Sequence, residues 1–156
     1  MVGIAVWIDE TPVSAIQEAQ LLLERLSVDW PEGIGFFQVI GEDNQSIETP
    51  ARNALKELLR ASRASIRAAP VVYEGTGFRA AAVRAIVTGL LSQRSYGFPH
   101  RVYSTLEDGA LSVAREFEKR EPTRFARELC EAMAGLRDAH ARAFPSAPQS
   151  FIRYKG

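Results

Sequence analysis

Short runs of apolar residues alternate along this chain with longer segments in which apolar residues recur every three or four positions. The short runs are rich in β-branched and aromatic residues, as buried strands are, and the longer segments have the period of amphipathic helices. We expect strands at residues 2–8, 34–40, 71–74 and 101–104. We expect helices at residues 13–26, 49–67, 79–93, 106–119 and 125–143.

Two of these helices have clear start signals. Thr49 precedes Pro50, which predicts Thr49 as an N-cap and Pro50 as the first helical residue. Thr105 can cap the fourth helix, with Glu107 and Asp108 in the first turn, where negative charges are favourable. Both helices therefore begin where a side-chain oxygen can accept hydrogen bonds from the first free N–H groups.

Strands and helices alternate in the order β-α-β-α-β-α-β-α-α, which predicts an α/β fold with a largely parallel sheet of about four strands. A chain of 156 residues fits a single domain and can bury a substantial core. A domain of this order could be complete by residue 120. The helix at residues 121–144 would then be appended to it, and residues 145–156 would form a flexible tail.

The charges and the single cysteine exclude some functions. Lys plus Arg and Asp plus Glu are equal at 19 each, so the net charge is zero, which argues against nonspecific binding to nucleic acid or membranes. Cys130 cannot form a disulfide within the chain, and no Cys or His spacing suggests a metal site. The N-terminal segment lacks the pattern of a signal peptide or membrane span, so we expect a cytoplasmic protein without a metal or cofactor.

A glycine-rich loop, Gly75-Thr76-Gly77, follows the third strand and leads into the third helix. Parallel sheets bind ligands beyond the carboxyl ends of their strands, and a helix N-terminus attracts anions. Arg79 is a cation in the first turn of that helix, which is unfavourable with the helix dipole unless Glu74 or a bound anion compensates it. Two interpretations stay open: a tight turn, which a lone G-x-G favours, or a small anion site.

The second predicted helix carries a stripe of cations at spacings of four, four, three and four: Arg52, Lys56, Arg60, Arg63 and Arg67. These spacings place all five on one side of a helix. Glu57 is the only acid within the helix, so ion pairs between neighbouring turns do not account for the stripe. It is either a solvated surface or a docking surface for an acidic protein partner. Zero net charge and the lack of interleaved aromatic residues make nucleic acid the less favoured partner.

The last helix is amphipathic, with apolar residues on one side from Phe125 to Leu136. This side would pack on the domain or, alternatively, form a homo-oligomer or partner interface. In the tail, the segment from Phe151 to Tyr154 could serve as a short docking peptide. His100 and His140 have no obvious Asp or Ser partner by spacing, so the sequence gives little support for catalysis.

Two segments of the chain resemble the STAS domain, the fold of bacterial anti-sigma-factor antagonists and related signalling proteins. One is the short strand V-V-Y-E-G at residues 71–75, before an alanine-rich helix, and the other is R-V-Y-S-T-L-E-D-G-A-L-S at residues 101–112. With the element order, the resemblance covers roughly residues 1–120. Antagonists of that family carry a phosphorylatable Ser or Thr where the second helix begins, and Thr49 and Ser46 are the nearest residues here.

The sequence and the resemblance favour a non-enzymatic interaction or signalling domain. It would dock a protein partner through the cations of the second helix, and a homo-oligomer formed through the last helix is compatible with this function. The alternative hypothesis is a protein that binds a small anion or ligand, or a degenerate enzyme, and that uses the loop from Gly75 to Arg79.

Overall fold

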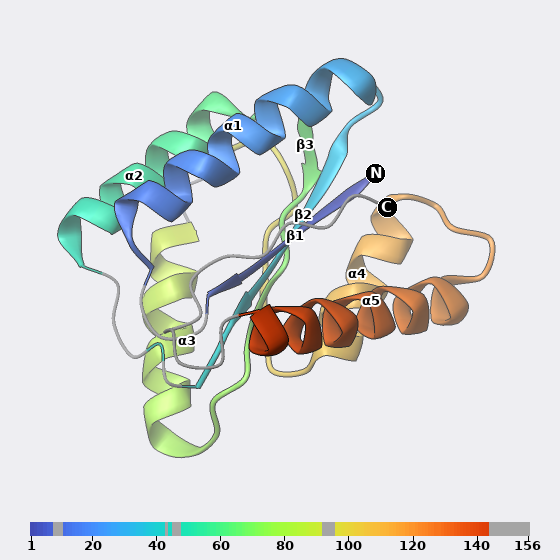
Figure 1. Ribbon diagram of the computed structural model, residues 1–156. Helices are drawn as coiled ribbons and strands as arrows, with labels where there is room; N and C mark the ends of the chain where they lie inside the picture. The colour runs from blue at the N-terminus through green and yellow to red at the C-terminus, as the bar shows by residue number, and fades with distance from the viewer. Residues whose placement is uncertain (8–10, 43, 45–47, 92–95, 144–156) are drawn as a thin grey trace.

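The computed structural model describes residues 1–7, 11–42, 44, 48–91 and 96–143, except for the side chains of residues 79, 86, 90, 91 and 143. Strands and helices alternate along the chain, as the sequence predicts (Figure 1). The strands are β1 (Val2–Trp7), β2 (Ile34–Ile40), β3 (Ile66–Ala68), β4 (Val71–Tyr73) and β5 (Val102–Tyr103). The helices are α1 (Val13–Asp29), α2 (Thr49–Ala61), α3 (Gly77–Leu91), α4 (Leu106–Glu116) and α5 (Pro122–Ala143).

The described strands lie in one sheet, and each described pairing is parallel. The order is β1-β2-β4-β5, so these strands follow one another across the sheet in chain order. Both β3 and β4 pair with β2: Ile34 aligns with Ile66 at the amino end of β2, and Gln38 aligns with Val71 further along. The structure therefore confirms an α/β fold with a largely parallel sheet, and it adds the short strand β3 to the four that we expected.

The prediction of a single helix over residues 49–67 is wrong at its end. α2 stops at Ala61, and the chain turns through Ser62 and Ser65 before Ile66 enters β3. Ile66 pairs with Ile34 of β2, and its side chain is buried in the core. Pairing with a buried strand therefore outweighs the helical spacing that Ile66 has in the sequence.

Of the two predicted N-caps, one is confirmed. The Thr105 hydroxyl oxygen accepts a hydrogen bond of 3.2 Å from the backbone N–H of Asp108. α2 instead has Glu48 as its N-cap, and Thr49 is its first helical residue. Four other boundaries shift by two or three residues: α1 ends at Asp29, α3 begins at Gly77, α4 ends at Glu116 and α5 begins at Pro122.

Helices cover both faces of the sheet and enclose two apolar cores (Figure 1). α1 and α2 pack on one face against residues such as Trp7 and Phe36, and α4 and α5 pack on the other against Val6 and Phe37. Neighbouring residues of one strand belong to different cores because successive side chains point to opposite faces. β2 is buried on both faces, which explains its nearly continuous apolar sequence.

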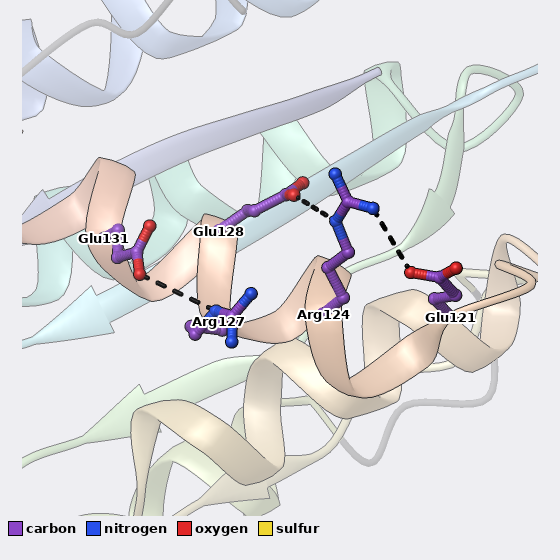
Figure 2. A network of polar contacts seen from close by, with 5 residues as sticks. All are labelled: Glu121, Arg124, Arg127, Glu128 and Glu131. Atoms are coloured by element: carbon purple, nitrogen blue, oxygen red, sulfur yellow. Dashed lines mark hydrogen bonds and ion pairs between the residues drawn. The ribbon is translucent and has the colours of Figure 1, made fainter.

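α5 is amphipathic, as predicted. Its inner side places Leu129, Met133 and Leu136 in the core that it shares with α4. Its outer side carries a ladder of ion pairs formed by Glu121, Arg124, Arg127, Glu128 and Glu131 (Figure 2). Exposed pairs of this kind stabilise a helix only slightly, so the apolar residues are what holds α5 on the sheet. Self-association through this helix stays a prediction.

Candidate functional site

The loop between β4 and α3 lies at the carboxyl end of the sheet (Figure 1). The backbone N–H of Glu74 donates to the carbonyl oxygen of Ile40 at 3.0 Å, which joins the loop to β2. The Glu74 carboxylate accepts a hydrogen bond of 2.7 Å from Nη2 of Arg137 on α5, and the two side chains are only 27% and 31% exposed. The sequence suggested Arg79 as the partner of Glu74. The structure shows Arg137 in that role, and the side chain of Arg79 lies outside the described part.

Both positions of the loop favour glycine over residues with a side chain. A Cβ atom on Gly75 would lie 2.5 Å from a ring carbon of Tyr73, which is closer than real side chains approach. Gly77 has a φ of +73°, in the left-handed region that side chains disfavour. Thr76 lies between them and is exposed. This geometry supports the tight-turn interpretation, and anion binding by Thr76 and Gly77 stays a prediction.

Two contacts hold the first half of α3 against this loop. Nη1 of Arg84 donates to the carbonyl oxygen of Gly75 at 3.3 Å. Ala80, one turn earlier, is buried with 1% of its surface exposed. The start of α3 is therefore fixed to the end of β4, although the helix extends beyond the strands at the carboxyl end of the sheet (Figure 1).

One side of α3 presents apolar residues to the solvent. Phe78 is 92% exposed, whereas Val83 and Val87 on the opposite side are partly buried. The exposed positions recur every three or four residues and so share one side of the helix. They are Phe78, Ala81, Ala82, Ala85, Thr88 and Gly89, which we call the α3 surface. None of these residues is charged, so the surface is apolar apart from one hydroxyl group.

The sequence pattern did not reveal the α3 surface. α3 is apolar on most sides, so its pattern does not specify which side faces the core. The one available signal was Phe78, a large aromatic residue beside a glycine turn. In the described part of the chain, no helix has the length and apolar composition needed to cross a bilayer.

The structure divides the predicted basic stripe. The five cations are Arg52, Lys56 and Arg60 on α2, Arg63 in the following turn and Arg67 in β3. The Arg67 guanidinium lies over the Phe117 ring, 5.1 Å from its centroid, and 3.9 Å from Glu118. Arg60 pairs with Glu57 at 2.7 Å. The stripe is thus shorter than the sequence suggested, and partner binding by these five residues stays a prediction.

Of the two residues suggested as phosphorylation sites, only Thr49 lies in the described part of the chain. Thr49 is exposed at the first residue of α2. Ser46 lies outside the described residues. A phosphate on Thr49 would lie at a helix N-terminus, where the dipole favours negative charge. The geometry is compatible with modification of Thr49, which stays a prediction.

A cleft of about 330 Å³ opens beside β5, and its polar lining includes His100, Arg101 and Glu116. Nδ1 of His100 lies 2.9 Å from the carbonyl oxygen of Phe98, so Nδ1 carries a proton and donates it to that oxygen. The hydroxyl of Ser112, also in the cleft, donates to the Gly109 carbonyl of its own helix at 2.7 Å. Its proton therefore points toward the helix backbone, whereas an activated serine directs it to a base.

Two further reactive side chains, Cys130 and His140, lie on α5. Burial raises the pKa of the Cys130 thiol, with further contributions from Glu107 and Glu131, so the thiol is a poor nucleophile at neutral pH. His140 is buried on α5. Among the residues that the structure describes, no three His, Cys, Asp or Glu side chains are grouped as a metal site would require.

No protein-family model matches the chain, and no curated protein or solved structure shows significant similarity to it. The resemblance to the STAS domain therefore rests on the segments at residues 71–75 and 101–112 and on the element order. It stays a prediction.

Proposed function

We propose that this chain is a protein-interaction domain that binds its partner through the α3 surface. One observation carries the proposal: a side of α3 led by Phe78 exposes apolar residues over about three turns. Among the residues that the structure describes, many other large apolar side chains lie in two cores, and the other exposed large hydrophobic residues, Leu21 and Val28, lie on α1. A contiguous apolar side of a helix is typical of a binding surface.

The residue types of the α3 surface suit a helical partner. Burial of a phenylalanine side chain contributes about 1.5–3 kcal/mol, so Phe78 can act as the anchor that enters a pocket of the partner. Ala82, Ala85 and Gly89 have small side chains, which allow the axis of a second helix to approach closely. We therefore expect the partner to present the apolar side of an amphipathic helix.

The start of this surface is held in place before the partner binds. Arg84 bonds to the loop carbonyl of Gly75, and Glu74 in the same loop bonds to Arg137 of α5. A surface that is already ordered loses less conformational entropy on binding. The strand β4, the loop and α5 thus form a support from which Phe78 projects.

The cations of α2 are proposed to favour an acidic partner. Arg60 and Glu57 lie close enough to Tyr96, which follows α3, to influence the pKa of its hydroxyl. The basic part of α2 therefore lies near Tyr96, five residues beyond the end of α3. Charges at the rim of an interface mainly raise the association rate, so Lys56 and Arg60 would steer the partner without providing most of the affinity. The resemblance to STAS domains supports a signalling role for such an interaction.

Site-specific photo-crosslinking in the cells that produce the protein tests this proposal. A photo-reactive phenylalanine analogue replaces Ala82 in the full chain, and a matched control carries it at Val28, which is 80% exposed on α1. We expect one discrete cross-linked protein from position 82 and none from position 28. The cross-link should disappear when Ala85→Arg is added, because a charge would then be buried in the interface.

Three results would count against the proposal: equal cross-linking from both positions, no cross-linking from position 82, or a cross-link that survives Ala85→Arg. A cross-link to a second copy of this chain would show self-association through α3 in place of a separate partner.

A further inference from the structure

The cleft of about 330 Å³ beside β5 has the size of a small-molecule site. Its lining includes residues 99–101, which lead into β5, and Ser112 and Glu116 of α4. These residues belong to the described part of the chain, whereas the tail at residues 145–156, which the sequence suggested as flexible or as a docking peptide, lies outside it. The volume is at the lower end of the range of ligand pockets, so the cleft suits a molecule of amino-acid size.

Two opposite charges line this cleft. Arg101 is exposed, and Glu116 is partly buried on α4. Within the part of the chain that the structure describes, neither side chain forms an ion pair or a hydrogen bond, whether with the other or with a third residue. Glu116 would repel a purely anionic ligand, and Arg101 would repel a purely cationic one. The two charges therefore favour a ligand that carries both signs of charge.

The segment that carries Arg101 is held in place by the sheet. The backbone N–H of Ala69 donates to the carbonyl oxygen of Pro99 at 3.0 Å, and the N–H of Val71 donates to the carbonyl oxygen of Arg101, also at 3.0 Å. The lining on this side of the cleft is thus formed before a ligand arrives. A preformed site loses less conformational entropy on binding.

The other polar groups of the lining are hydrogen-bond acceptors. Nδ1 of His100 donates to the carbonyl oxygen of Phe98 at 2.9 Å, which leaves Nε2 of the neutral ring as an acceptor. The Ser112 hydroxyl donates its proton to the Gly109 carbonyl oxygen at 2.7 Å, so its lone pairs remain as acceptors. With the Glu116 carboxylate, these groups suit the donors of an ammonium group. The apolar part of the lining comes from Ala68, Pro70, Pro99 and the ring of Tyr103.

We propose that this cleft binds a free amino acid with an apolar side chain. The carboxylate of the ligand pairs with the Arg101 guanidinium, which can donate two parallel hydrogen bonds to it. The ammonium group pairs with the Glu116 carboxylate, and the side chain lies against the apolar part of the lining. The site shares no residue with the α3 surface, so it is a second function of the domain and can be tested separately.

Two-dimensional amide NMR of the full, isotope-labelled chain tests this proposal by titration with L-leucine and L-phenylalanine. We expect saturable shift changes at residues 100–103 and 112–116 and none at Val28, which is exposed on α1. At least one of the two amino acids should bind with a Kd of about 1 mM or lower.

Analogues with one charge test the requirement for both. 4-Methylpentanoate and 3-methylbutylamine keep the side chain of leucine and lack its amino group or its carboxylate, and 3-phenylpropanoate and 2-phenylethylamine do the same for phenylalanine. Each analogue should bind at least about tenfold more weakly than its amino acid, because it loses one charge-assisted interaction.

Variants of the chain test the two charged residues. Arg101→Gln and Glu116→Gln each remove one charge and keep a polar side chain, and each should weaken binding at least about tenfold. Arg115→Gln is the matched control, because Arg115 is exposed on α4 next to Glu116 but outside the cleft, and it should leave binding unchanged. The amide spectrum of each variant also reports whether the domain is folded.

Four results would overturn the proposal. They are no saturable shifts with either amino acid, shifts confined to residues outside the cleft, equal binding of the singly charged analogues, and binding that both charge-removing substitutions leave intact. The analogues are measured on the parent chain, so their comparison holds even if a variant does not fold.

Discussion

Arg137 of α5 donates a hydrogen bond of 2.7 Å to the carboxylate of Glu74, the residue that follows β4. The two residues are 63 positions apart in the sequence. Their contact ties the last helix to the loop from which α3 begins. The support of the proposed docking surface thus comes from two parts of the chain that only the fold brings together.

Removal of this ion pair should destabilise the domain. Both side chains are about one-third exposed or less, so Arg137→Ala leaves the Glu74 carboxylate partly buried without its main cation. We expect a loss of about 1–2 kcal/mol in the free energy of unfolding, less than for a fully buried pair. Urea denaturation measures this loss. Arg127→Ala is the control, because its pair with Glu131 is about 70% exposed and should contribute less than about 0.5 kcal/mol. Equal losses in the two variants would contradict the prediction.

The sequence was sufficient to predict most of the fold. Short apolar runs such as residues 34–40 became strands, and the alternation of strands with helices indicated the parallel sheet. The end of α2 was wrong because Ile66 continues the helical spacing and joins a strand through a contact with Ile34. A contact of this kind depends on tertiary structure, which local spacing does not contain.

The candidate site was predictable only in part. The glycines at residues 75 and 77 suggested a tight turn, and the structure shows a left-handed φ at Gly77 and no room for a Cβ atom at Gly75, which are compatible with one. The partner of Glu74 could not be found, because Arg137 is distant in the sequence and many cations were equally plausible. The exposed side of α3 could not be found either. A helix that is apolar on most sides can bury any of them, and only the surrounding elements decide which one remains exposed.

Substitution of the loop glycines should show that the turn depends on them. Gly75→Ala places a Cβ atom against the Tyr73 ring, and Gly77→Ala forces a side chain into the left-handed region. We expect each variant to lose about 1–2 kcal/mol of unfolding free energy. Gly135→Ala is the control, because a Cβ atom at Gly135 meets nothing within 4 Å and alanine favours a helix. That control should gain up to about 1 kcal/mol in the same urea titration. A stable Gly75→Ala variant would show that the turn can rearrange.

Tyr96 carries a hydroxyl group that folding buries at a cost. The residue is 1% exposed, and among the described residues its hydroxyl has no hydrogen-bond partner. Tyr96→Phe keeps the ring and removes the unsatisfied group. We expect a gain of about 1 kcal/mol in unfolding free energy at neutral pH. A loss of stability in Tyr96→Phe would show that the hydroxyl makes a favourable contact.

The Tyr96 hydroxyl should also make the free energy of unfolding depend on pH in the alkaline range. Burial raises the pKa of the Tyr96 hydroxyl above its usual value of about 10, Arg60 opposes this effect and Glu57 adds to it. Just above pH 10 the folded chain therefore keeps a proton that the unfolded chain has lost, so the stability of the parent falls as the pH rises through this range. The unfolding free energy of Tyr96→Phe should fall less steeply with pH. Urea titration of the two proteins from pH 9 to 11 measures this dependence. Equal slopes of unfolding free energy against pH would argue against a buried hydroxyl.

Substitutions on the α3 surface should separate binding from stability. Phe78 is almost fully exposed, so Phe78→Ser removes few contacts within the domain and should change its unfolding free energy by less than about 0.5 kcal/mol. The same change removes the anchor of the proposed interface and should weaken partner binding at least tenfold, because an anchor contributes about 2 kcal/mol or more. Val28→Ser, also at an exposed apolar residue, should leave binding unchanged. Isothermal titration with the partner that cross-linking identifies measures the binding affinity, and urea denaturation measures the unfolding free energy. If Phe78→Ser unfolds the domain, Phe78 has a structural role. If the variant binds the partner as tightly as the parent does, the partner binds elsewhere.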